Sequence, residues 1–374
     1  MMYEKYAKLI PTYPVFHKRK VPFSPSIKLP GRFRERIDAI RALEGKLDGF
    51  LLSLRDYFDI VVDAYAANVH YSTALEGNPL ALEEVRRMTR NSFEGISMMK
   101  PDASRQEIIN HLSAIVHPEA FATPWSQEAI RKVHYLLTKN VEPDPIPGRY
   151  RTDPGPVYPT ENGTDVVFVG AGSESVPDEM QSLLDWLNGA GEAIEPLVSA
   201  AVFFHEFASI HPFTEGNGRA GRTLFNIYLQ THGFPNARLC KIDYEITKDA
   251  SRDTYYTLLS WTDESGDYSA LLDFFLDAVL AAYEVANAAF DSKRRHISAL
   301  EENSIKVLFG ARNAKGGWFR VKDAVGWVGG ASERTVSKTL NGLCAKGLLE
   351  DEGLTRARRF RLPDPISNIK ELVG

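Results

Sequence analysis

A short polar segment between His211 and Arg222 carries side chains that could together handle a nucleotide. Gly216 and Gly218 permit positive φ and a close approach of a ligand to the backbone, and they precede an apolar-periodic stretch that predicts a helix. The first N–H groups of a helix have no intrahelical partner and lie at the positive end of its dipole, so this loop is typical of a phosphate site. Arg219 and Arg222 share one face of that helix and could bind further phosphate oxygens.

The same segment contains an acid and a base. Glu215 is a hard oxygen ligand, the kind of group that holds Mg²⁺ against phosphates. His211 has an ordinary pKa of about 6.5, so its neutral form is abundant at physiological pH and can take a proton from a hydroxyl. We therefore predict attack of a hydroxyl on a nucleotide phosphate. A loop–helix junction with a capping acid and two solvated arginines is the alternative interpretation, and it leaves the joint presence of these groups unexplained.

This segment resembles the signature of the Fic family, HPFx(D/E)GNGRxxR, and matches it at every fixed position. Residues 201–210 resemble the apolar helix that the family places before its catalytic His. The resemblance implies that His211 is the general base that activates a Ser, Thr or Tyr hydroxyl of a target protein. That hydroxyl attacks the α-phosphorus of ATP and displaces pyrophosphate, so the implied activity is protein adenylyltransferase.

The resemblance also assigns the other polar residues of the segment. Mg²⁺ or Mn²⁺ is expected on Glu215, while the anion hole and the outer phosphates are expected on Gly216, Asn217, Gly218, Arg219 and Arg222. Phe213 is expected in the core, where it pins the loop.

A second pattern lies far upstream, where Ser72, Glu76 and Gly77 occupy the fixed positions of (S/T)xxxE(G/N). It resembles the inhibitory motif of the Fic subclass with an N-terminal inhibitory helix, and residues 59–75 have the apolar spacing of a helix. The resemblance implies that Glu76 forms an ion pair with Arg222 and so denies that guanidinium to the γ-phosphate of ATP. A helix C-terminus with an exposed Glu is the alternative interpretation.

Between the two motifs, Val157-Tyr158 and Val166–Val169 predict short strands joined through an Asn162-Gly163 turn. They resemble the family's flap, a hairpin whose edge can add a strand of target protein through main-chain hydrogen bonds. Val169 and Gly170, at the end of the hairpin, are expected at the nucleotide. An ordinary surface hairpin is the alternative.

Downstream, residues 255–259 resemble the helix that closes the adenine side of the pocket in relatives, which makes Tyr255 the expected contact to the base. Core packing is the alternative for Tyr255 and Tyr256. Asp263 stands where some members carry Asn, so polar recognition of the base stays open.

Composition bounds these expectations. The chain has 374 residues, 44% hydrophobic content and a net charge of −5, which suits a folded protein and argues against one dominated by nucleic-acid binding. No stretch approaches a membrane span, and residues 1–5 lack the start of a signal peptide, so a cytoplasmic location is expected. Cys240 and Cys344 are expected in different domains, without a disulfide or a zinc site.

The predicted fold is mostly α, with a Fic-type helical core, a small β-hairpin flap and a C-terminal winged helix-turn-helix. The predicted units are an N-terminal arm with the inhibitory helix (1–95), the catalytic core (96–292) and the winged-helix domain (300–374). Five prolines before residue 31 predict an extended arm over the core or a partner subunit, and a homodimer is plausible. Helical patterns begin near Arg34 and recur at 81–89, 104–116, 126–139, 177–188, 195–209, 218–231, 248–261 and 269–291.

The C-terminal pattern predicts helices at 304–309, 321–328 and 332–346, then a two-stranded ribbon over 347–350 and 356–362. Between Ala331 and Leu362 there are seven basic and four acidic side chains, so DNA is one expected partner. Dimerisation or docking of a target protein is the alternative, because winged helices are reused for protein interaction.

Several functions therefore stay open. The leading one is an adenylyltransferase inhibited by its own Glu76. Removal of AMP by a water that Glu76 orients, transfer of UMP or another phosphate-linked group, and a DNA-binding regulator that senses a nucleotide are the alternatives.

Overall fold

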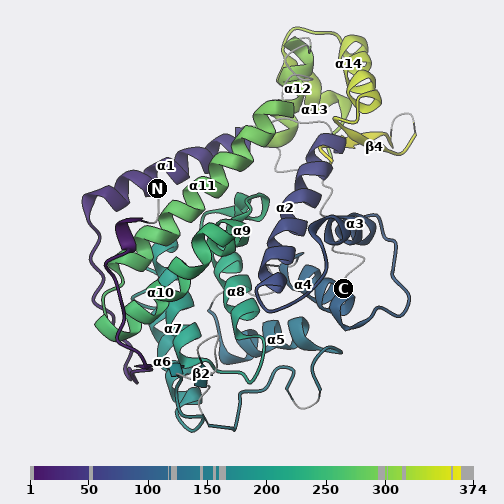
Figure 1. The fold of residues 1–374 in the computed structure, drawn as a ribbon. Coiled ribbons are helices and arrows are strands. Elements are labelled where there is room, and N and C mark those ends of the chain that lie inside the picture. Colours follow the sequence, from purple (N-terminus) through teal and green to yellow (C-terminus); the bar gives the residue numbers. More distant parts are fainter. Residues whose placement is uncertain are drawn as a thin grey trace.

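The structure is a computed structural model that describes residues 4–363 apart from 50–53, 117, 119–123, 144–145, 155–156, 160–165, 294–299, 301, 314–316 and 355–356. The described residues are mostly helical and form two separate hydrophobic cores, a large one between Tyr6 and Phe290 and a small one between Leu300 and Phe360 (Figure 1). The large core is built by α1 (Gly31–Gly49), α2 (Leu54–Ala74), α3 (Leu82–Phe93), α4 (Ala103–Val116), α5 (Gln127–Thr138), α6 (Val176–Leu187), α7 (Pro196–Ile210), α8 (Asn217–Thr231), η3 (Pro235–Leu239), α9 (Ile242–Thr247), α10 (Asp249–Ser265) and α11 (Ser269–Lys293).

Helix α7 lies at the centre of the large core. It begins with Pro196 in its first turn, where the missing N–H costs nothing, and almost every later residue is buried. Its neighbour α8 approaches closely because Gly221 has no side chain: a Cβ there would lie 3.0 Å from the Phe204 ring. The loop between these two helices is the polar segment from His211 to Gly216, so a closely packed helix pair positions it.

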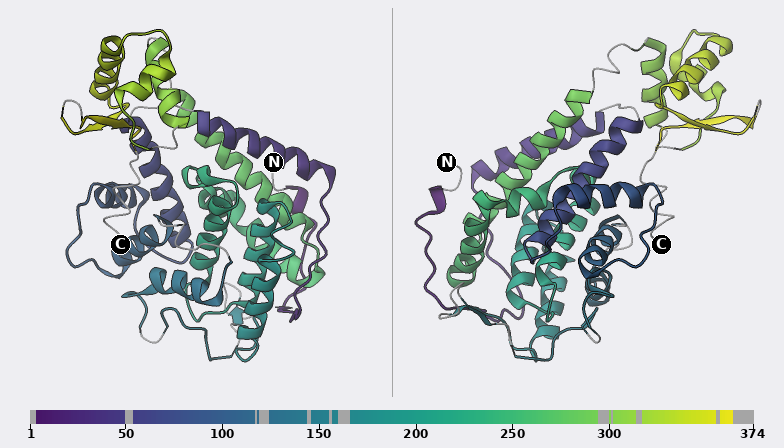
Figure 2. Two further views of the ribbon diagram at one scale, coloured as in Figure 1. Left: turned by 180° about the vertical axis from the view of Figure 1, so that it is seen from behind. Right: turned by 45° about the vertical axis from the view of Figure 1, so that its right-hand side comes forward.

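The other helices surround this pair. Helices α1 and α11 run side by side along one flank, and α2 packs against α3, α4 and α9 on the other (Figures 1 and 2). Most helices lie where the sequence pattern predicts them. The exceptions are the short α9 and η3, which are too brief to show a period, and α2, which ends at Ala74 so that Glu76 lies in the following turn.

The N-terminal arm lies against the core, as predicted. It contains η1 (Glu4–Tyr6) and the two-residue strand β1 (Val15–Phe16), which the sequence did not predict. Lys5 binds Asp273 at 2.5 Å, which anchors the start of the arm on α11.

A small sheet joins the arm to the predicted hairpin. Its order is β1-β3-β2, with β2 (Val157–Pro159) antiparallel and β1 parallel to β3 (Val166–Val169). The two hairpin strands are therefore confirmed, whereas the Asn162-Gly163 turn lies outside the described residues.

The C-terminal module has its own core. It comprises α12 (Glu302–Asn313), α13 (Val321–Val328), α14 (Glu333–Ala345), β4 (Glu350–Glu352) and β5 (Arg359–Arg361). The two strands pair antiparallel, and Phe360 also bridges to Phe319, which precedes α13. Three helices followed by a ribbon is the predicted order, while the winged helix-turn-helix itself stays a prediction.

The boundary predicted at residue 95 does not separate two cores, because α1, α2 and α3 share one core with α4–α11. No helix among the described residues is long and apolar enough to cross a membrane. Cys240 and Cys344 are both free thiols.

Candidate active site

The loop after α7 starts at His211 with an uncommon backbone conformation. His211 is the C-cap and adopts the left-handed region, at φ 54° and ψ 62°, which is uncommon for a residue with a side chain. Its N–H still donates to the carbonyl of Phe207 at 3.0 Å, and its ring is half-buried. A strained conformation at a candidate base is typical of functional sites, where packing holds it in place.

Arg151 holds the end of α7 from the side of the flap. Its Nε donates to the carbonyl of His211 at 2.7 Å, and its guanidinium also reaches the carbonyls of Ile210 and Ala171. The last carbonyls of a helix have no intrahelical donors, so a buried cation here satisfies them and complements the helix dipole.

The interior of the loop is closed by Asn217. Its carboxamide accepts from the N–H of Phe213 at 2.9 Å and donates to the carbonyl of the same residue at 2.7 Å. Both ends of this side chain are therefore used within the loop. Asn217 shapes the loop, and its backbone N–H, in the first turn of α8, is the part that remains suited to an anion.

His134 of α5 supports the loop from below. Its ring stacks on Phe213, with centroids 3.7 Å apart, which confirms that Phe213 is a core residue. The N–H of Gly148 donates to its Nδ1 at 3.0 Å, so the ring donates from Nε2 to the carbonyl of Glu215 at 2.8 Å. Burial lowers the pKa of His134 to about 4, which agrees with this neutral tautomer.

The proton arrangement of His211 suits a general base. Its Nδ1 lies 3.2 Å from the carbonyl of Ala208, and a carbonyl can only accept, so Nδ1 carries the ring proton. In the neutral ring Nε2 then holds the lone pair. Burial, followed by the charge of Arg151, lowers the pKa of His211 to about 4, so the imidazole is neutral at physiological pH.

The loop opens into the N-terminus of α8. Gly216 is the N-cap and has φ 76°, and a Cβ there would lie 3.1 Å from Thr138 and 3.4 Å from His134. The N–H groups of the first turn follow directly, next to the exposed carboxylate of Glu215. Burial and then the neighbouring Glu142 raise the pKa of Glu215, so a cation beside these two acids would be stabilised.

Arg222 is engaged by the last turn of α2 and by the turn that follows it. Its side chain is 2% exposed, its Nε donates to the Ser72 hydroxyl at 2.9 Å, and its Nη2 donates to Glu76 Oε1 at 2.8 Å. The Nη2 group also donates to the Ser72 carbonyl at 2.9 Å. Burial alone would raise the pKa of Glu76, but Arg222 outweighs burial and holds that pKa below its ordinary value.

The contact between Glu76 and Arg222 leaves no room for a side chain at Gly218. A Cβ at this position would lie 2.1 Å from Glu76 Oε1 and 3.0 Å from Arg222 Nη1. The carboxylate of Glu76 therefore lies against the backbone of the first turn of α8, where an anion is favoured. The negative charge of the Glu76 carboxylate also raises the pKa of the His211 imidazole, against the larger effect of burial.

Arg219 is engaged as well, by acids that the sequence analysis did not single out. Its Nη1 pairs with Glu107 of α4, and its Nη2 lies 3.9 Å from Glu142. Asn78, which follows Glu76 and Gly77, donates to the other oxygen of Glu107 at 2.5 Å. In this structure Arg219 ties the loop to α4, so a phosphate would have to compete with Glu107 for its guanidinium.

The remaining predicted residues lie in different surroundings. Tyr255 is 3% exposed and packs on Phe204 and Phe274 in the core, so its ring presents no open face to a base, whereas Tyr256 beside it is 46% exposed. Packing rather than ligand contact explains Tyr255. Val169 and Gly170, at the end of β3, are half-buried near the loop that Arg151 holds.

Asp263 is buried and accepts from the Ser209 hydroxyl at 2.6 Å. Its carboxylate therefore belongs to a polar network inside the protein, described below, and not to an open base-binding surface.

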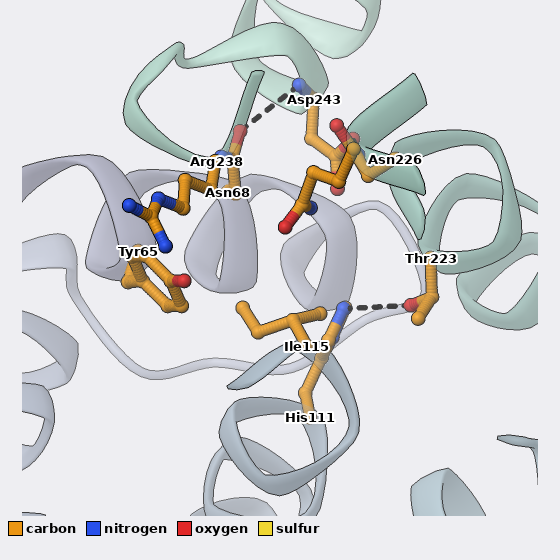
Figure 3. Close-up of a pocket in the computed structure, with 9 residues that line it drawn as sticks. Tyr65, Asn68, His111, Ile115, Thr223, Asn226, Arg238 and Asp243 are labelled. Atoms are coloured by element: carbon orange, nitrogen blue, oxygen red, sulfur yellow. Dashed lines mark hydrogen bonds between the residues drawn. The ribbon is translucent and has the colours of Figure 1, made fainter. Parts of the chain in front are cut away.

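A small polar cavity lies between α2, α4, α8 and α9 (Figure 3). Asn68 of α2 accepts from the N–H of Asp243, and His111 of α4 contacts the Thr223 hydroxyl at 3.1 Å, so two hydrogen bonds cross its walls. Its volume of about 20 Å³ admits a single water-sized molecule. The cavity is too small for a nucleotide, and the first turn of α8 is the better candidate site.

Sequence reasoning missed Arg151, His134 and Glu107, which hold the loop and its first arginine. Arg151 and His134 act mainly on backbone carbonyls, for which no residue pattern exists. Glu107 shares a helix face with no other candidate, and only its charge could have suggested a pairing.

Comparison with known proteins supports the resemblance of this loop to the Fic signature. Residues 124–229 match the model of the Fic/DOC family. The chain is 27% identical over 287 residues to protein adenylyltransferase fic-1 of Caenorhabditis elegans, which covers 72% of this chain and 50% of that protein. It is 28% identical over 260 residues to protein adenylyltransferase Fic of Nematostella vectensis, covering 65% of this chain and 55% of that one. The chain thus spans about half the length of these curated relatives.

Solved structures share the fold. A Fic family protein from Desulfovibrio desulfuricans G20 superposes with a TM-score of 0.59 at 22% identity, covering 91% of this chain and 98% of that one. Residues 134–508 of C. elegans Fic-1 superpose with a TM-score of 0.52 at 24% identity, covering 70% and 72%. At this identity the likeness concerns the fold alone.

Proposed function

We propose that this chain, a Fic/DOC family protein and a distant homologue of the Fic-1 protein adenylyltransferases, transfers AMP from ATP to a hydroxyl of a target protein. The observation that carries the proposal is the half-buried imidazole of His211, protonated on Nδ1 and neutral at physiological pH, in the loop that ends at an anion-binding helix terminus.

In the proposed reaction, the oxygen of a Ser, Thr or Tyr side chain attacks the α-phosphorus of ATP. His211 Nε2 takes the hydroxyl proton as the new P–O bond forms, and the bond to the β-phosphate oxygen breaks, so pyrophosphate leaves with the electron pair. The N–H groups at the start of α8 are suited to the charge that develops on the α-phosphate oxygens.

The residues present fit a divalent cation. Glu215 lies at the accessible side of the loop, and partial desolvation followed by the neighbouring carboxylate of Glu142 raises its pKa, a repulsion that a cation would relieve. Glu215 would hold Mg²⁺ or Mn²⁺, which supplies positive charge against the phosphates of ATP.

Glu76 is the proposed inhibitor. Its carboxylate engages Arg222 and lies over Gly218, so an ATP γ-phosphate would meet a negative charge where it needs a guanidinium. A block of about 1–3 kcal/mol would reduce the productive arrangement about 5- to 150-fold.

The test is incubation with Mg²⁺ and ATP labelled at the α-phosphate. We expect Glu76→Gly to increase protein-bound label about 5- to 150-fold over wild type, and His211→Ala in the same background to abolish it. Glu94→Gly removes a comparable Glu from the turn after α3 and should leave labelling unchanged.

Two results would contradict the proposal. Label that does not depend on His211 excludes its role as the base, and equal labelling by Glu76→Gly and an active wild type excludes the inhibitory role. Release of AMP from a modified protein without any transfer by Glu76→Gly would instead favour the reverse activity.

The C-terminal module is proposed to contact protein more readily than DNA. Arg358, Arg359 and Arg361 each pair with an acid of β4, namely Asp351, Glu352 and Glu350. Phosphate contacts would have to replace these pairs. Electrophoretic mobility shifts across salt concentrations test this: a salt-sensitive shift at low salt would favour DNA.

A further inference from the structure

The last turn of α7 is also held by the N-terminal arm, through a hydrogen bond between His17 and Ser209. We propose that His17 of the arm is a positioning residue for His211: through Ser209 it fixes the turn that carries the catalytic imidazole. This inference rests on the proposed role of His211 as the base.

The contacts of His17 connect three elements. Its Nε2 lies 2.7 Å from Glu179 Oε2 on α6, and its Nδ1 lies 2.8 Å from the Ser209 hydroxyl on α7. The side chains of His17 and Glu179 are 5% and 3% exposed, so water does not compete for these bonds. The arm residue is thus built into the protein interior beside the end of α7.

Ser209 occupies a decisive position in this turn. The carbonyl before it, of Ala208, accepts the ring proton of His211, and the carbonyl after it, of Ile210, accepts from Arg151. A shift of Ser209 therefore displaces both acceptors that orient the base. His17 and Arg151 hold the same turn from different directions.

The assignment of donors and acceptors around Ser209 indicates how firmly His17 is held. At neutral pH the Asp263 carboxylate, with a pKa that burial raises to about 6, accepts the single hydroxyl proton of Ser209 at 2.6 Å. Ser209 must then accept from Nδ1–H of His17, while Glu179, whose pKa is held low against burial by His17 and Ser175, accepts from Nε2–H. Both ring nitrogens are therefore held by hydrogen bonds, one to Ser209 and one to Glu179, and a side chain that lacks two such groups cannot replace the ring.

The backbone of the same residue reaches the flap. The N–H of His17 donates to the carbonyl of Val169 at 2.8 Å, next to the parallel pairing of β1 with β3. One residue of the arm thus contacts the flap through its backbone and the base-bearing turn through its side chain. Removing the side chain should release the turn while β1 stays paired.

The experiment compares His17→Ala, Ser209→Ala and the double variant, all in the Glu76→Gly background. We expect His17→Ala to lower kcat for transfer about 10- to 100-fold, with KM for ATP changed less than twofold, because a small misplacement of the base affects the chemical step. If His17 acts through Ser209, the double variant should be no slower than the more affected single variant.

Lys5→Met is the matched control. It removes the arm's ion pairs with Asp273 and Asp277 of α11, neither of which is hydrogen-bonded to Ser209 or His211 in the described chain, and should leave kcat unchanged. Amide hydrogen exchange is the second readout: residues 209–213 should exchange faster in His17→Ala, while α1 and α11 keep their protection.

Three results would overturn the inference: an unchanged kcat in His17→Ala, multiplicative losses in the double variant, or faster exchange throughout α1 and α11, which would indicate general destabilisation. The exchange data decide the matter even if Glu76→Gly transfers nothing. In that case the proposed function fails, while faster exchange confined to 209–213 still establishes that His17 holds the turn.

Discussion

The helices that flank the proposed catalytic loop are contacted on two faces by residues distant in sequence. On the inhibitory face, Ser72 and Glu76 bind Arg222; on the supporting face, His17 and Asp263 bind Ser209. The inhibitory face relies on a Glu whose side chain is 32% exposed and lies in a turn beyond the end of α2. The supporting face is buried between α6, α7, α10 and the arm.

This difference separates a contact that can open from one that must persist. The Glu76 carboxylate is 32% exposed and can be rehydrated when it leaves Arg222, but the guanidinium that it leaves behind is 2% exposed, so another anion would have to take the place of the carboxylate. The groups of the supporting face would leave unpaired charges in the interior, which is far more costly. The proposed inhibitory contact is therefore the one that an anionic ligand could replace, whereas the contacts of the supporting face have no such substitute.

Arg222→Met should break the inhibitory face with the largest effect. Its guanidinium is 2% exposed, and its loss leaves Ser72 and Glu76 without their donor and Asp243 without the nearby charge that lowers its pKa. We expect the free energy of unfolding to fall by about 3 kcal/mol. This value is at the lower end for a broken buried ion pair, because Glu76 retains access to water. Urea unfolding measures it, and Glu76→Gln provides the comparison. A loss below about 1 kcal/mol would show that this face contributes little to stability.

The supporting face should respond to acid in the opposite sense to the inhibitory face. Asp263 has a pKa raised from 3.8 to about 6, so the folded state binds its proton more tightly and stability falls as pH rises between these values. Glu76 has a lowered pKa, so its contribution is complete above 4.5 and disappears as pH falls through the folded pKa.

Asp263→Asn isolates this effect. Relative to the variant, wild type should gain up to about 3 kcal/mol of unfolding free energy as pH falls from 7 towards 4. Chemical unfolding at several pH values measures the difference between the two proteins. A difference that is constant with pH would indicate that Asp263 is not the titrating group.

Gly218→Ala should destabilise the protein less than the changes above, and mainly when Glu76 is present. A Cβ placed 2.1 Å from Glu76 Oε1 must displace the carboxylate, whereas in the Glu76→Gly background that atom is absent. We expect the substitution to be about 1–2 kcal/mol more destabilising in wild type than in Glu76→Gly. Thermal unfolding of the four proteins forms the cycle, and equal effects in both backgrounds would place Glu76 away from Gly218.

The sequence was most informative where the functional groups are contiguous. Gly216 to Arg222 could be read as a loop feeding a helix because the glycines and the apolar period adjoin each other. The Glu76–Arg222 contact, which joins residues far apart, was accessible only through the resemblance of a short pattern to an inhibitory motif.

The rest could not be predicted, for physical reasons. His134 and Arg151 bind backbone carbonyls, and any residue type supplies a carbonyl. The two-residue strand β1 is too short for a period, so the place of His17 beside Ser209 depends entirely on tertiary packing. Tyr255 carries an aromatic side chain equally suited to a core and to a base contact, and burial in the core distinguishes them only after folding.

The position of β1 constrains how a polypeptide could be recruited. In the described chain β3 lies between β1 and β2, so an added strand would have to join the outer side of β1 or of β2, and β2 is the edge strand of the predicted flap. That strand offers Val157, Tyr158 and Pro159, and proline has no N–H to donate. So few main-chain bonds would align an added strand but would contribute little affinity.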